Sequence, residues 1–188
     1  MFSDILGNSK STSQTRQRNE QALYEPIARY LENGLSLYGR CEMYVTKSII
    51  PRAVKARLDK DSLFYVRVEK LKPDIMGFYQ PKPSGRHWAH IAPGLIIVEV
   101  KEGPLKLKDI YQAKMYSEVF GSFNTFLISR NPVPVELERF LVEHPYIRTT
   151  HAGNKQLFLA SFSQQAIGGE TVTETKWSFN RSPFTPYP

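Results

Sequence analysis

The chain has 188 residues, of which 41% are apolar and 23% charged, a balance that excludes a disordered chain and predicts one globular domain. It contains no run of about 20 apolar residues, as a spanning helix requires, and its single cysteine, Cys41, excludes a disulfide framework and an iron–sulfur cluster. The net charge of +7 favours a polyanionic partner such as DNA. We therefore expect a protein of the cytoplasm, or of the host cytoplasm if it is viral, with no membrane partner.

The first third of the chain predicts two helices around an extended segment. Residues 1–18 are polar and Ser/Thr-rich, which predicts a flexible basic N-terminal arm. A helix is expected over 20–34, where apolar residues recur at helical spacing up to Asn33-Gly34, a common helix end. An extended segment is expected at 37–46 and a second helix at 48–60.

The middle of the chain predicts three strands followed by a helix. Two consecutive strands are expected at 62–71 and 73–80. A Pro/Gly/His-rich loop at 81–94 then leads into 94–103, whose continuous apolar run is typical of a strand buried on both faces. The next segment, 105–122, predicts a helix that ends at Gly121.

The remaining part of the core predicts one further helix between strands. These elements are expected at 123–129 (strand), 133–144 (helix), 146–151 (strand) and 156–162 (strand). Residues 163–188 are rich in Gly, Ser, Thr and Pro, and we expect a C-terminal extension that covers the body or a partner. The element order predicts an α/β domain over 19–162, with a mixed central sheet flanked by helices.

Two acids and a lysine occupy the strands on which a site could be built. Asp74 begins one expected strand, and Glu99 and Lys101 lie two residues apart in the next one. Residues i and i+2 of a strand point to the same side, and pairing of the two strands as a hairpin would bring both carboxylates to one end of the sheet. Two carboxylate oxygens and a backbone carbonyl suit Mg²⁺, and an ammonium beside the ion could orient or deprotonate a water.

Pro-Asp at 73–74 followed by Glu-Val-Lys at 99–101 resembles the PD-(D/E)xK nuclease superfamily, which includes restriction endonucleases, Holliday-junction resolvases and RecB-like exonucleases. The resemblance spans roughly 20–162 and implies a restriction-endonuclease-like fold. It implies a Mg²⁺-dependent DNA nuclease, with Mn²⁺ as a substitute, that hydrolyses phosphodiester bonds, most often as an endonuclease and a homodimer. By this resemblance Asp74, Glu99 and the Val100 carbonyl bind the metal, and Lys101 assists the water.

Three more residues extend the resemblance, each with an ordinary alternative. Members of the family often carry a Glu near the start of the first helix, and Glu20 lies on the apolar stripe of its predicted helix; it could equally be a charge at a helix start. Gln112 and Tyr116 match a QxxxY element of RecB-like members and lie one turn apart. They could equally be a core amide and a core aromatic residue.

Several basic and histidine residues are candidates for simpler roles. Arg52 and Lys55 occupy the polar face of the expected helix at 48–60, and Lys106 and Lys108 follow the strand that carries Glu99. All four are candidate phosphate contacts, and a solvated face is the alternative reading for Lys106 and Lys108. His87 and His90 have a ligand-like spacing but no acid or cysteine cluster beside them, which favours loop residues over a zinc site.

Two other functions compete with the nuclease. The first is a catalytically inactive nucleic-acid-binding or assembly protein on the same scaffold, which would bind DNA without cleaving it. The second is an unrelated α/β domain whose charge only keeps it soluble. In that case Asp74 and Glu99 would lie far apart.

Overall fold

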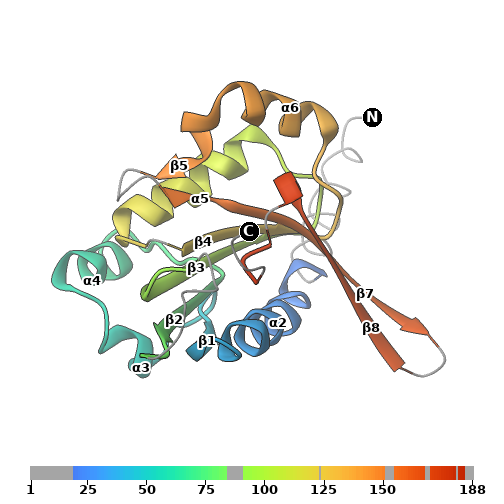
Figure 1. Ribbon diagram of the computed structural model, residues 1–188. Coiled ribbons are helices and arrows are strands. Elements are labelled where there is room, and N and C mark those ends of the chain that lie inside the picture. The colour runs from blue at the N-terminus through green and yellow to red at the C-terminus, as the bar shows by residue number, and fades with distance from the viewer. Residues whose placement is uncertain are drawn as a thin grey trace, which may run out of the picture.

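The computed structural model describes residues 19–83, 91–122, 124–150, 155–167, 170–180 and 182–184. Six strands form one sheet in the order β1-β2-β3-β4-β7-β8, with helix α2 on one face and helices α5 and α6 on the other (Figure 1). The prediction of an α/β fold with a mixed central sheet flanked by helices is confirmed. The predicted arm at 1–18 and the residues His87 and His90 lie outside the described residues.

The sheet changes from antiparallel to parallel at its centre. Strands β1, β2 and β3 pair antiparallel, β3 pairs parallel with β4, β4 pairs parallel with β7, and β7 pairs antiparallel with β8. Helix α5 provides the crossover that a parallel β3–β4 pair requires. The strands are β1 (Gly39–Val45), β2 (Ile75–Pro81), β3 (Gly94–Lys101), β4 (Asn124–Ser129), β7 (Phe158–Ile167) and β8 (Glu170–Trp177).

The central strand β3 is buried on both faces, as its apolar run predicts. Ile96, Val98 and Val100 pack in the core beneath α2, whereas Ile97 packs in the core on the α5 face. This alternation fixes which face each β3 side chain reaches. Glu99 shares the face of Ile97 and therefore lies on the α5 side. The helices are α2 (Tyr24–Ser36), α3 (Arg52–Lys55), α4 (Lys60–Arg67), α5 (Leu107–Val119) and α6 (Val135–Glu143).

Helix α4 replaces the strand predicted over 62–71, and that prediction is wrong. The aromatic and β-branched residues of this segment favour a strand, but the Asp59 side chain accepts a hydrogen bond of 2.7 Å from the Ser62 N–H and caps a helix. Ser62 and Val66, one turn apart, form its buried side. Tertiary packing of this short amphipathic face therefore outweighs local propensity.

Two predicted helix boundaries also differ from the structure. Helix α2 continues through Asn33-Gly34 to Ser36, and Gly34 lies against Phe184, where an added Cβ would come within 2.6 Å of the ring. Gly34 therefore permits a close contact and does not end the helix. The helix expected over 48–60 is reduced to α3, a single turn after Pro51, because the α4 cap at Asp59 already begins a new helix.

The C-terminal segment joins the sheet. Strand β7 runs past residue 162 to Ile167, and β8 pairs with it from Ala160↔Trp177 to Ile167↔Glu170. Beyond Ser161, β7 has no partner on β4, so the outer ends of the two strands extend beyond the body as a ribbon (Figure 1). The strand expected over 146–151 is instead a 3₁₀ turn, Pro145–Arg148, followed by β5 (Thr149–Thr150), which pairs with β6 (Lys155–Gln156).

Within the described residues, no helix is long and apolar enough to cross a bilayer.

Candidate functional site

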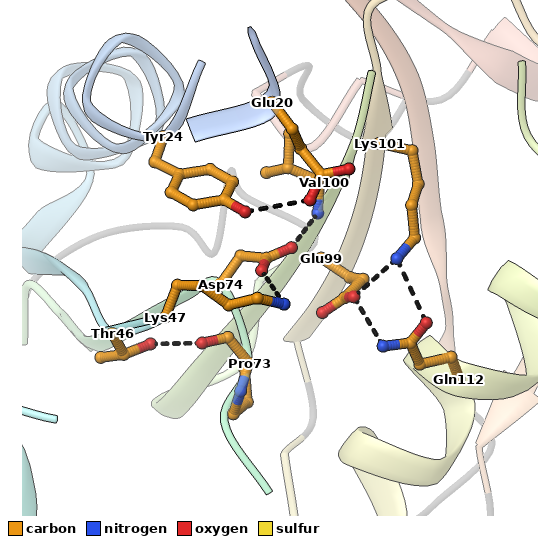
Figure 2. A network of polar contacts seen from close by, with 10 residues as sticks. All are labelled: Glu20, Tyr24, Thr46, Lys47, Pro73, Asp74, Glu99, Val100, Lys101 and Gln112. Atoms are coloured by element: carbon orange, nitrogen blue, oxygen red, sulfur yellow. Dashed lines mark hydrogen bonds and ion pairs between the residues drawn. The ribbon is translucent and has the colours of Figure 1, made fainter. Parts of the chain in front are cut away.

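The pairing register of β2 and β3 brings Asp74 opposite Glu99. The last pair of the ladder is Ile75↔Val98, so the next position along each strand sets Asp74 across from Glu99, on one face. Both carboxylates are completely buried, at 0% exposed. Thr46 fixes the start of β2, because its N–H donates to the Asp74 carbonyl (2.8 Å) and its hydroxyl to the Pro73 carbonyl (2.6 Å). Figure 2 shows both acids in one polar network.

Each oxygen of Asp74 has a different partner. Oδ2 accepts a hydrogen bond of 2.8 Å from the Val100 N–H. Oδ1 accepts no directed hydrogen bond from the described residues, but it lies 2.7 Å from Lys47 Nζ in an ion pair. Asp74 is therefore fixed in place by β3 and neutralised by a lysine just beyond the end of β1.

Glu99 is bound through one oxygen only. Its Oε1 accepts hydrogen bonds from Lys101 Nζ (2.8 Å) and Gln112 Nε2 (2.7 Å), and Lys101 also donates to Gln112 Oε1 (3.1 Å), which closes a triangle. Oε2 is buried and has no hydrogen-bond partner among the described residues. Burial and the nearby Asp74 charge raise the pKa of Glu99 to about 7, although Lys101 and Lys47 oppose the shift.

Both lysines of the site remain charged. Burial alone would lower the pKa of Lys101, but the attraction of Glu99 and Asp74 outweighs it and raises that pKa above its ordinary value. The pKa of Lys47 is raised in the same way, burial being outweighed by Asp74 and Glu99. With both acids ionised, the four side chains therefore sum to no net charge.

Glu20 lies at the mouth of this network. Together with Lys101, Lys106, Lys108 and Gln112 it lines a cavity of about 270 Å³. Its Oε1 accepts a hydrogen bond of 3.0 Å from the Tyr24 hydroxyl. The pKa of that hydroxyl is raised by burial and by the charges of Asp74 and Glu20, so Tyr24 stays a donor and orients Glu20.

The remaining predicted residues lie in two different settings. Tyr116 is buried in the core between α4 and α5, against Phe120. Burial raises the pKa of its hydroxyl and an interaction with the Gln112 side chain opposes the shift, so Tyr116 lies directly behind Gln112. Arg52 and Lys55 are exposed on α3 and do not line the cavity. Lys106 and Lys108, in contrast, stand at its rim.

Lys47 is the site residue that sequence reasoning missed. It follows the extended segment predicted at 37–46, and β1 pairs with β2 up to Val45↔Ile75. The register would have placed the residues after Val45 beside Asp74, but a register cannot be read before the strand partners are known. Only the structure assigns this lysine to the site.

The donor set fits a hard divalent cation such as Mg²⁺. Within the described residues no group of three His, Cys, Asp or Glu side chains could hold a metal, so the ligands would be two acids and a backbone oxygen. Glu99 Oε2 and Asp74 Oδ1 are buried and lack directed hydrogen bonds. The Val100 N–H points to Asp74, and the carbonyl of a strand residue leaves on the same side as its N–H. The Val100 carbonyl therefore leaves β3 on the side of Asp74.

Chemically, the arrangement can hold a cation between two acids and present an ammonium beside it. Lys101 is fixed by two acceptors, and its side chain is 20% exposed, so it reaches the cavity from a defined direction. Gln112 holds both Lys101 and Glu99 and therefore sets their relative position. Comparison with known proteins assigns no family to this geometry, since no family model, no curated protein and no solved structure matches the chain.

Proposed function

We propose that this protein is a Mg²⁺-dependent deoxyribonuclease that hydrolyses phosphodiester bonds, with Asp74, Glu99 and Lys101 at its centre. The observation that carries the proposal is the pair of completely buried acids facing each other across β2 and β3. Two neighbouring buried carboxylates are costly for a fold, and such perturbed groups cluster at functional sites. A purely structural core would be more stable with apolar residues at these positions.

The side chains of the site have separable roles in this reaction. Asp74, Glu99 and the Val100 carbonyl would hold the ion, which stabilises negative charge on the phosphate during hydrolysis. Lys101, held by Glu99 and Gln112, orients the attacking water. Glu20 narrows the mouth of the cavity from the α2 side. Lys106 and Lys108, at the rim, bind the phosphates that flank the scissile one.

Supercoiled plasmid cleavage tests the proposal. The wild-type protein is expected to nick or linearise plasmid with Mg²⁺ or Mn²⁺ and to leave it intact with EDTA. Asp74→Asn keeps the shape of the side chain but removes its charge, so cleavage should fall at least 100-fold. Glu136→Gln, which alters an exposed acid on α6, serves as the matched control and should cleave normally. Full cleavage by purified Asp74→Asn would remove the proposed site.

The non-catalytic nucleic-acid-binding protein is the second candidate, and the Lys47–Asp74 ion pair favours it, because this pair already neutralises one metal ligand. It predicts salt-sensitive DNA binding by wild type and Glu99→Gln alike, with no cleavage by either. The nuclease predicts DNA binding by both and cleavage by wild type alone. We also propose that the nuclease acts in the cytoplasm as a homodimer, because two antiparallel strands require two centres; sedimentation with a short duplex tests that assembly.

A further inference from the structure

The two buried acids form ion pairs with two different lysines. Lys101 approaches Glu99 from β3 itself and is shared with Gln112 on α5. Lys47 approaches Asp74 from the end of β1 and lies 2.7 Å from Oδ1. Figure 2 shows the Lys101 ammonium beyond Glu99, and the Lys47 ammonium beside Asp74, on the side that faces Glu99 in this view. The sequence resemblance involves only the first of these lysines.

The Lys47 ammonium pairs with Asp74 Oδ1, which is the Asp74 oxygen available to a metal ion. Asp74 Oδ2 is already used by the Val100 N–H, so Oδ1 is the oxygen left for a cation. A carboxylate oxygen has two lone pairs, and Oδ1 can therefore receive Lys47 and one ion together. A second ion on Asp74 would need the position that Lys47 holds.

The charge of the site also disfavours a second divalent ion. Asp74, Glu99, Lys47 and Lys101 sum to zero and Glu20 at the mouth adds one negative charge, so one bound ion gives +1 and a second would give +3. Asp74 and Glu99 are completely buried, so solvent screens little of this repulsion. Both added ions would also lie near Lys47 and Lys101, which repel them.

We propose that Lys47 takes the place of a second metal ion, so that the site would bind one divalent cation, held by Asp74 and Glu99. The inference rests on the proposed function. Lys47 remains on Asp74 as a fixed positive charge, and its side chain is 32% exposed, so its ammonium would stay accessible to a bound phosphate. It is a binding and positioning residue that supplies charge and exchanges no proton with the substrate.

Mn²⁺ titration by calorimetry, without DNA and at constant pH, tests this assignment. Wild type is expected to bind one Mn²⁺ per chain. Lys47→Met keeps most of the length of the side chain but removes the charge, so it should bind a second Mn²⁺ or bind the first at least tenfold more tightly. Lys82→Met is the matched control, because Lys82 follows β2 at the end of the sheet opposite to Asp74, and it should behave as wild type.

A second variant separates the charge of Lys47 from its packing. Lys47→Arg keeps the positive charge and should retain one Mn²⁺ per chain, together with most of the cleavage rate at saturating Mn²⁺. Lys47→Met should cleave at least tenfold more slowly than wild type under the same conditions. Circular dichroism establishes that each variant is folded before it is titrated.

The outcomes distinguish this inference from the proposed function. Two Mn²⁺ per wild-type chain, or unchanged stoichiometry and affinity in Lys47→Met, would overturn the role of Lys47 and leave the nuclease intact. If neither wild type nor Lys47→Met nor Lys47→Arg binds Mn²⁺, the metal-dependent reaction is ruled out, and this inference with it.

Discussion

Glu99 carries the proton that decides when the site can accept a cation. Its pKa is raised to about 7 by burial and by Asp74, and a metal binds the ionised carboxylate only. Below pH 7 a proton therefore competes with the ion, and above pH 7 the competition disappears. Mn²⁺ affinity, measured by calorimetry from pH 5.5 to 8.5, should rise up to tenfold per pH unit below about pH 7 and level off above it.

A variant without the titrating group provides the control for this pH dependence. Glu99→Gln cannot ionise, so its residual Mn²⁺ affinity should be weak and nearly constant over the same range. A wild-type affinity that stayed flat between pH 5.5 and 7 would contradict the assignment of this proton to Glu99.

At the scale of single residues, the sequence predicts which side chains of one strand lie side by side, but not which side chains a neighbouring strand brings to them. Glu99 and Lys101 are neighbours because of strand alternation, which is a local property. Gln112 reaches them from the helix that follows directly. Lys47 reaches Asp74 from a strand that precedes it by more than 25 residues, and only the β1–β2 register places it there. Arg52 and Lys55 show the converse, since a polar helix face by itself does not indicate a cavity.

Helix α4 begins at a single capping contact, and its stability should depend on that contact. Asp59→Ala removes the acceptor of the Ser62 N–H, which should lower the free energy of unfolding by about 1 kcal/mol. Urea denaturation followed by circular dichroism measures the change. Asp61→Ala is the control, because Asp61 lies in the same first turn but does not cap it, and a smaller loss is expected. Equal losses in both variants would show that the cap contributes nothing beyond charge.

At the scale of elements, segments with a clear apolar pattern were predictable, the short strands β1, β2 and β4 included, whereas elements that depend on a cap or on backbone pairing alone were not. Strand β3 and helix α5 follow from patterns that extend over eight or more residues. Helix α4 has an aromatic and β-branched composition typical of a strand, and its helical state depends on a cap and on packing against the body. The ribbon of β7 and β8 was missed because polar residues after Phe162 end the apolar pattern, while backbone pairing continues without it.

For the molecule as a whole, the rim lysines should determine how strongly salt weakens DNA binding. Each phosphate contact contributes about 0.9 to the slope of log affinity against log salt concentration for duplex DNA. Lys108→Ala removes one charge at the cavity and should lower that slope by about 0.9 in fluorescence anisotropy titrations. Lys82→Ala, at the far end of the sheet, should leave the slope unchanged. Identical slopes for the two variants would show that Lys108 does not contact DNA and that the DNA-binding surface lies elsewhere.

Asp74, Glu99, Lys47 and Lys101 together carry no net charge, so without a metal ion these four side chains neither attract nor repel a polyanion. A bound divalent ion would turn the site into a local attractor, so metal and nucleic acid should each tighten the binding of the other by the same factor, as linkage requires. The protein would then hold its ion weakly while idle and firmly once a target phosphate has arrived. The site would in this way become fully occupied by its metal ion only once the substrate is bound.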